Sequence, residues 1–122
     1  MSVVLVIEDD PDIRALITRR IAKSGIEVIS AGTGEQGLEL AASHRPNLIV
    51  LDIRLPGISG WQVIERLNAD ELLKEIPVLI ASIVDPSEVD PTDESQEPVT
   101  VHLVKPIPRG QLEAAVHEAL NK

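Results

Sequence analysis

Acidic side chains directly follow two apolar runs that read as strands. Glu8 and Asp9 come after "VVLVI" (3–7), and Asp52 comes after "LIVL" (48–51). If these runs are neighbouring parallel strands, their carboxyl ends meet and the three carboxylates converge. Carboxylates so close together repel one another and need a compensating cation. Hard oxygen ligands with room for water suit Mg²⁺, which binds few protein carboxylates and also takes phosphate oxygens.

A hydroxyl and an ammonium stand at two further strand ends. Ser82 ends the run "PVLIAS", and Lys105 follows the run "VHLV". Facing the carboxylates, they would complete a cradle for a phosphoryl group. Each residue alone has an ordinary explanation, as a strand-end serine, a turn lysine or a solvated acid. The coincidence of complementary groups at four strand ends favours one shared site.

A structural role explains one of two acids at these strand ends better than the other. Asp10 is better explained as a helix cap than as a ligand, because Pro11 suits the first helical position after it. Asp52 is harder to dismiss, because it follows four apolar strand residues and has to face a crevice to avoid burial.

The elements that would position these residues alternate along the chain. Short β-branched runs recur between helical patterns every 20–30 residues or so, which is typical of repeated βα units and a parallel sheet. The expected strands are 3–7, 27–30, 48–51, 77–82 and 101–104, and the expected helices begin after Asp10, begin at "TGEQ" (33–36), run from about Gly60 to Lys74, and span 108–121.

The fold class follows from this order of elements. Right-handed crossovers favour a flavodoxin-like, doubly wound α/β fold with a five-stranded parallel sheet in the order 2-1-3-4-5. Its ligand crevice lies beyond the carboxyl ends of strands 1 and 3. At 122 residues the chain is expected to form one domain, 1–122.

Composition narrows the classes of partner and location. The formal net charge of −9 argues against nucleic-acid binding, because phosphate backbones demand a basic face. No apolar run is long enough to span a bilayer, and no signal peptide is evident, so a cytoplasmic protein is expected. The absence of cysteine excludes disulfides and thiol chemistry.

Four stretches follow one another in order over nearly the whole chain: "VLVIEDDPDIR", "LIVLDIRLPGISGWQVI", "IPVLIAS" and "VHLVKPI". Together they resemble the receiver domain of two-component response regulators. The resemblance implies a phospho-accepting signalling domain that takes a phosphoryl group from the phosphohistidine of a histidine kinase or a phosphotransfer domain. It implies self-catalysed phosphorylation and slow autodephosphorylation, and no classical enzyme turnover.

The resemblance also implies a role for each candidate residue. Asp52 would be the phospho-acceptor. Mg²⁺ would be bound by Asp9, Asp52 and the backbone carbonyl of Arg54, and Glu8 would act on it mostly through water. Ser82 would occupy the hydroxyl position and Lys105 the position of the phosphate-binding lysine.

The chain departs from the receiver pattern in three places. His102 stands where an aromatic switch residue is common, and it is equally well explained as an edge-strand histidine. Ser82 is followed by bulky Ile83, and "SIVD" resembles receivers attached to hybrid sensor kinases. Residues 83–100 hold six acids, three prolines and no Lys or Arg, so the helix between strands 4 and 5 is expected to be degraded or missing. This segment is either a drifted loop or a remodelled surface that orders on a basic partner.

Three other functions compete with this interpretation. A phosphatase of the haloacid dehalogenase type needs a second carboxylate two residues after the nucleophile, where this chain has Arg54. A flavodoxin-type nucleotide binder would not carry "EDDP" after its first strand. A pseudo-receiver that binds partners without phosphorylation remains the alternative, although the complete set of site residues counts against it.

Two arrangements of the whole protein are compatible with this sequence. The chain is a stand-alone receiver, or it is a receiver taken from a hybrid histidine kinase. No DNA-binding module is expected in it, because it ends with the helix of 108–121.

Overall fold

The computed structural model describes residues 2–82, 99–104 and 111–120, with the backbone alone described at Ser82, Gln111 and 99–104. Strands and helices alternate through the first two thirds of the chain. In chain order the elements are β1 (Val3–Ile7), α1 (Pro11–Ala22), β2 (Glu27–Ala31), α2 (Gly34–His44), β3 (Leu48–Leu51), α3 (Gly60–Asn68), β4 (Val78–Ser82), β5 (Val99–Val104) and α4 (Gln111–Leu120).

The strands form a parallel sheet with β1 and β3 in its interior. β1 pairs with β2 on one side and with β3 on the other, and β3 pairs with β4. This confirms the predicted flavodoxin-like order 2-1-3-4, with its switch point between β1 and β3. β5 lies beside β4 in the structure, with an irregular register between Val78 and Leu79.

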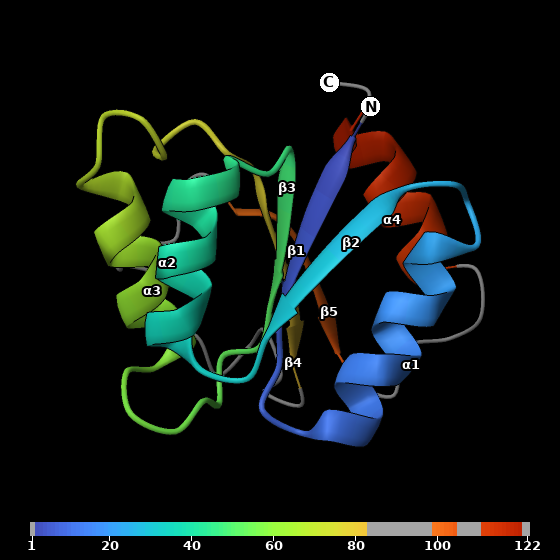
Figure 1. The fold of residues 1–122 in the computed structure, drawn as a ribbon, viewed down its shortest axis with the longest axis horizontal. Coiled ribbons are helices and arrows are strands. Elements are labelled where there is room, and N and C mark those ends of the chain that lie inside the picture. The colour runs from blue at the N-terminus through green and yellow to red at the C-terminus, as the bar shows by residue number, and fades with distance from the viewer. Residues whose placement is uncertain (1, 83–98, 105–110, 121–122) are drawn as a thin grey trace.

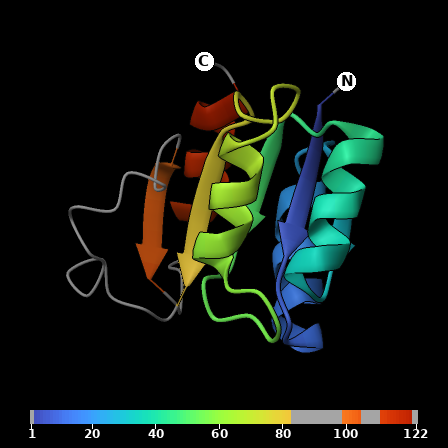
Figure 2. The same cartoon turned by 90° about the vertical axis from the view of Figure 1, so that its left-hand side faces the viewer.

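Helices cover both faces of the sheet. α2 and α3 lie on one face, and α1 and α4 lie on the other (Figure 1). Turned by 90°, the strands run side by side and their arrowheads, which mark the carboxyl ends, all point toward the bottom of the view (Figure 2). Each face has its own buried aliphatic cluster, one packed by α1 and α4 and the other by α2 and α3. The central strands are therefore apolar on both sides, as their sequences predict.

Helix starts follow the capping residues. Asp10 caps α1 through its carboxylate, and Pro11 occupies the first turn. Ser59 caps α3 and forms a reciprocal capping box with Gln62, so two otherwise unpaired backbone N–H groups at this end are satisfied. α3 therefore begins at the end of the loop that follows β3, and the side chains of Ser59 and Gln62 define this start.

The predicted end of the third helix is wrong. α3 ends at Asn68, six residues before the expected Lys74. The chain turns again at Asp70, whose carboxylate accepts a hydrogen bond from the Leu72 backbone N–H at 2.8 Å. A side chain that caps a new turn competes with continuation of the helix, and a helical pattern alone does not reveal this competition.

Two predictions lie partly or wholly outside the described residues. The prediction that the segment 83–100 lacks a long helix falls mostly on 83–98, and the first residues of the expected last helix, 108–110, are also outside. Within the described part, α4 begins at Gln111.

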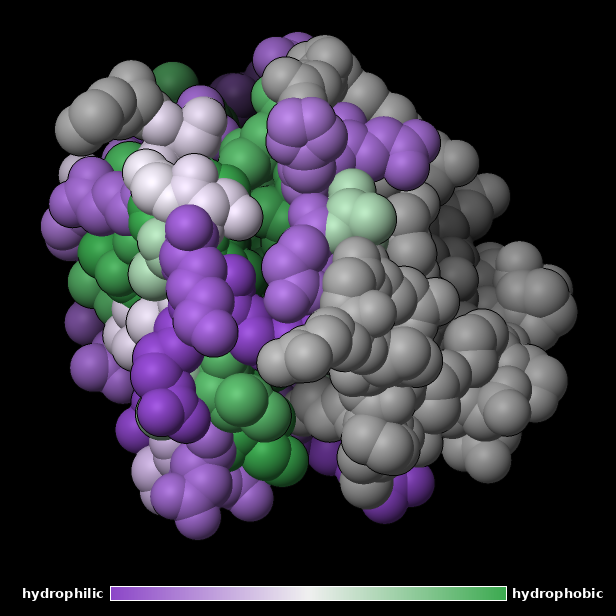
Figure 3. Space-filling model, turned by 90° about the vertical axis from the view of Figure 1, so that its right-hand side faces the viewer, coloured by the Kyte–Doolittle hydropathy of each residue, from purple (hydrophilic) through white to green (hydrophobic). Residues whose placement is uncertain are grey.

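Hydrophilic and hydrophobic side chains lie next to one another on the coloured part of the side that α1 and α4 occupy (Figure 3). The two helices are joined by Arg20 and Glu113, whose side chains form a two-point ion pair at 2.8 and 3.2 Å. No helix in the part of the chain that the structure describes is long and apolar enough to cross a membrane.

Candidate functional site

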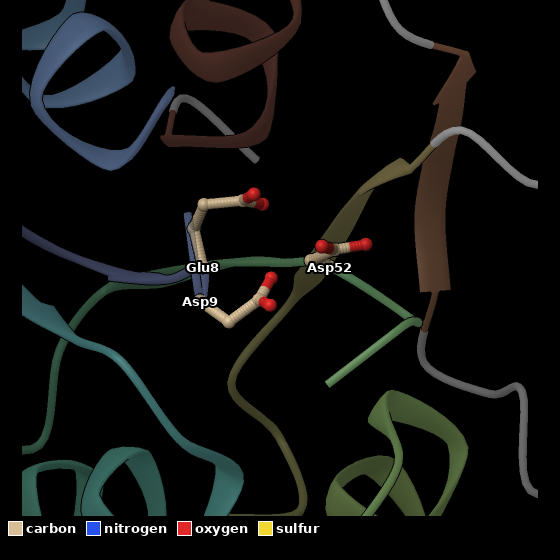
Figure 4. Close-up of side chains that lie close together, drawn as sticks. All are labelled: Glu8, Asp9 and Asp52. Carbon is tan, nitrogen blue, oxygen red and sulfur yellow. The ribbon is translucent and has the colours of Figure 1, made fainter. Parts of the chain in front are cut away.

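Three carboxylates meet at the carboxyl ends of β1 and β3. Ile7 and Leu51 are register partners in the ladder, so Glu8 and Asp52, the residues that follow them, leave the sheet side by side. The Asp52 backbone N–H donates to the Ile7 carbonyl at 3.0 Å and extends the ladder by one bond. Glu8, Asp9 and Asp52 each offer a carboxylate oxygen within 4.8 Å of the others (Figure 4). The convergence predicted from the strand ends is confirmed.

The three acids differ in burial. Glu8 is 2% exposed and Asp52 is 6% exposed, whereas Asp9 is exposed to solvent. In Figure 4 the side chains of Glu8 and Asp9 extend from the end of β1 toward Asp52, which follows β3. The site therefore combines two buried acids with one acid that faces solvent.

The donor set fits a small divalent cation. Like charges this close repel one another, and a bound cation would offset that repulsion. Oxygens that share one Mg²⁺ at about 2.1 Å lie at most about 4.2 Å apart. The observed 4.8 Å limit is within a small side-chain adjustment of that geometry.

The backbone after β3 holds Asp52 in place. The Arg54 N–H donates to Asp52 Oδ1 at 3.1 Å, and the Gly60 N–H donates to the Ile53 carbonyl at 2.9 Å. Gly60 also approaches this segment so closely that a Cβ atom there would lie 2.5 Å from the Asp52 carbonyl oxygen. The start of α3 is thus pressed against the backbone of the acid, a constraint that the sequence analysis did not identify.

Asp10 is a cap, as predicted. Its Oδ1 accepts hydrogen bonds from the backbone N–H groups of Asp12 at 2.9 Å and Ile13 at 3.2 Å. These bonds satisfy donors at the start of α1 and direct this carboxylate to the helix.

Arg14 is a residue near the site that the sequence analysis missed. Its Nη1 donates to the backbone carbonyl of Glu8 at 2.9 Å. A basic residue one helical turn after the cap was a visible signal, but only the folded chain brings its guanidinium back to the end of β1.

The remaining predicted site residues are placed less completely. Ser82 ends β4, and its backbone is paired with Val104 of β5. The side chains of Ser82 and His102 lie outside the described part of the structure, and so does the whole of Lys105. The predictions that involve the Ser82 hydroxyl and the Lys105 ammonium therefore stay predictions.

Sequence comparison identifies a family over most of the chain. Residues 4–117 match the response regulator receiver domain. The chain is 28% identical over 120 residues to Protein PilH of Pseudomonas aeruginosa, covering 98% of both chains. It is 31% identical over 122 residues to the transcriptional regulatory protein AfsQ1 of Streptomyces coelicolor, and it spans about half the length of that relative, 52%.

Solved structures agree with the sequence match. A sensor protein from Polaromonas sp. JS666 superposes with a TM-score of 0.89 at 27% identity, covering 98% of this chain and 96% of that one. The response regulator TrrA of Thermotoga maritima, solved in complex with Mg²⁺-BeF, superposes with a TM-score of 0.85 at 27% identity, covering 98% and 99%. The chain belongs to the receiver domains of two-component response regulators, and it carries an acidic Glu-Asp-Asp pocket at the switch point of its sheet.

Proposed function

We propose that this domain accepts a phosphoryl group on Asp52 in a Mg²⁺-dependent transfer from the phosphohistidine of a histidine kinase or a phosphotransfer domain. The observation that carries the proposal is the convergence of Glu8, Asp9 and Asp52, with two of the three acids buried and one facing solvent. The TrrA structure was solved in complex with Mg²⁺-BeF, which supports binding of Mg²⁺ by this domain.

Asp52 is the nucleophile of the proposed transfer. A carboxylate oxygen of Asp52 attacks phosphorus while the bond from phosphorus to the histidine nitrogen breaks, and the imidazole leaves with the bonding electron pair. The product is an aspartyl phosphate, which later loses its phosphoryl group to water. Glu8, Asp9, Asp52 and the Arg54 carbonyl would hold Mg²⁺, which when bound offsets the charge on the phosphoryl oxygens.

Ser82 and Lys105 complete the proposed site. The Lys105 ammonium offsets charge on the transferred group, and the Ser82 hydroxyl donates a hydrogen bond to it after transfer. Support comes from the backbone pairing of Ser82 with Val104, the residue before Lys105. This role requires the full sheet order 2-1-3-4-5, which we include in the proposal.

The proposed output is a change in the surface around β4 and β5, including residues 83–100. Inward movement of Ser82 toward the phosphoryl group would pull on the segment that follows it. We further propose that the unit of function is the domain 1–122, that it works in the cytoplasm with a kinase and a downstream protein, and that it does not bind nucleic acid. The run "SIVD" favours a hybrid kinase as its context.

The test is phosphorylation of the purified chain by a small phosphodonor such as phosphoramidate. Intact-mass spectrometry should detect one added phosphoryl group with Mg²⁺ and none after chelation by EDTA. Asp52→Asn should abolish the labelling. Asp12→Asn, a matched change at an exposed acid of α1, should leave it intact.

One outcome tests the acceptor residue, and the other tests the function. Labelling of Asp52→Asn at the wild-type rate would refute Asp52 as the acceptor. A folded wild type that takes no phosphoryl group from phosphoramidate or from a panel of histidine kinases would favour the alternative, a pseudo-receiver that binds partners without phosphorylation.

A further inference from the structure

Arg14 makes hydrogen bonds to the residues on both sides of Asp9. Its guanidinium Nη1 donates to the Glu8 carbonyl at 2.9 Å, and its backbone N–H donates to the Asp10 carbonyl at 2.8 Å. We propose that Arg14 is a positioning residue that fixes the orientation of Asp9 and thereby sets the affinity of the acidic site for a divalent cation. This inference rests on the proposed function.

Asp9 is the acid of the site that most needs such support. Glu8 and Asp52 are nearly fully buried, so the surrounding core restricts their side chains. Asp9 is exposed, and packing restricts it less. The backbone torsions at the end of β1 set the direction of its Cα–Cβ bond.

The hydrogen bond to Glu8 acts on those torsions. The carbonyl of Glu8 belongs to the peptide group that joins Glu8 to Asp9, and this group is planar. Holding its oxygen fixes the rotation of the whole plane, and with it the direction in which the Asp9 side chain leaves the backbone. Because a charged donor makes this hydrogen bond, it is stronger than a neutral one.

The loop after β2 leaves room for the guanidinium. A Cβ atom at Gly32 would lie 3.0 Å from Arg14 Nη1 and 3.8 Å from Arg14 Cζ. Any side chain at this position would push on the guanidinium that holds Glu8. The absence of a side chain at Gly32 therefore leaves the space that the Arg14 guanidinium occupies, which is a second observation in support of its position.

The charge of Arg14 and its positioning role act on cation binding in opposite directions. Removing a positive charge near the site would by itself strengthen Mg²⁺ binding, whereas releasing Asp9 would weaken it. We expect the loss of positioning to dominate, because partners that orient metal ligands typically account for a 10- to 100-fold difference in affinity.

Isothermal titration calorimetry with Mg²⁺ measures the effect directly and does not depend on phosphorylation. Arg14→Met should weaken binding by about tenfold, at the lower end of the range for partners that orient ligands. Arg14→Lys keeps the charge and one donor, so it should fall between wild type and Arg14→Met. The matched control is Arg19→Met, which removes an exposed positive charge from the same helix and should bind Mg²⁺ as the wild type does.

Gly32→Ala provides a second route if Arg14→Met fails to fold. The added methyl group should weaken Mg²⁺ binding in the wild-type background, by less than Arg14→Met does, because it displaces the guanidinium by a few tenths of an ångström. In an Arg14→Lys background, where the crowded guanidinium is absent, the same change should have little effect.

The outcomes separate this inference from the proposed function. Wild-type affinity or tighter binding in Arg14→Met, or additive effects of Gly32→Ala and Arg14→Lys, would overturn the positioning role alone. Absence of Mg²⁺ binding to the folded wild type would overturn the proposed function and this inference together.

Discussion

Gly60→Ala should destabilise the domain, because the backbone at this position has no room for a methyl group. The added Cβ would lie 2.5 Å from the Asp52 carbonyl oxygen and 2.7 Å from the Ile53 Cα. Ordinary contacts between such atoms are about 3.5 Å, so the two segments have to separate by about 1 Å. Both contacts are with backbone, so no side-chain rotation relieves them.

The expected loss of unfolding free energy is about 2 kcal/mol. Overpacking typically costs about 1–3 kcal/mol. Moving the start of α3 also weakens the 2.9 Å hydrogen bond from the Gly60 N–H to the Ile53 carbonyl, which contributes about 1 kcal/mol. The better helix propensity of alanine offsets up to about 1 kcal/mol of this.

Urea denaturation followed by far-UV circular dichroism measures this loss. Gly34→Ala is the comparison, because the three atoms nearest to its methyl group belong to the side chains of Ile58 and Val63 and not to the backbone. We therefore expect Gly34→Ala to lose less stability than Gly60→Ala. A loss below about 0.5 kcal/mol for Gly60→Ala, or equal losses for the two variants, would refute the backbone-contact argument.

Two further predictions concern α1. A double-mutant cycle with Arg20→Met and Glu113→Gln should give a coupling of about 1 kcal/mol that shrinks at high salt, because the pair has two-point geometry and both side chains are partly screened by solvent. Thr18→Val should raise the free energy of unfolding by about 1 kcal/mol, since Thr18 Oγ1 is buried without a hydrogen-bond partner in the described part of the chain. Thermal and urea melts measure both, and an uncoupled cycle or a destabilised Thr18→Val would contradict them.

The acidic site was predictable because it depends on the order of strands. Glu8 and Asp52 each follow an uninterrupted apolar run, and two such parallel runs at a switch point necessarily end side by side. The cap at Asp10 was equally predictable, because the acceptor and the donors lie within three residues of one another.

The end of the third helix was not predictable in the same way. The apolar pattern continues past Asn68, and Leu73 is buried, so periodicity alone extends the helix. The observed end depends on a local competition in which the Asp70 side chain bonds to the Leu72 backbone N–H. A side chain such as that of Asp70 can accept hydrogen bonds from nearby backbone N–H groups in place of the helical carbonyl, so the residue at which a helix ends is hard to predict from the pattern alone.

The sequence by itself determined the parallel α/β fold, the edge of the sheet where chemistry gathers, and the carboxylates that gather there. These features follow from hydrophobic periodicity and local capping, which are properties of the chain near each residue, and from the few strand orders that right-handed crossovers allow. Only the tertiary structure decided that Glu8 and Asp52 are buried while Asp9 is exposed. It alone brought the guanidinium of Arg14 to the Glu8 carbonyl, and the start of α3 onto the backbone of Asp52. Both contacts depend on the relative placement of separate elements, and that placement is set by how the helices pack on the sheet.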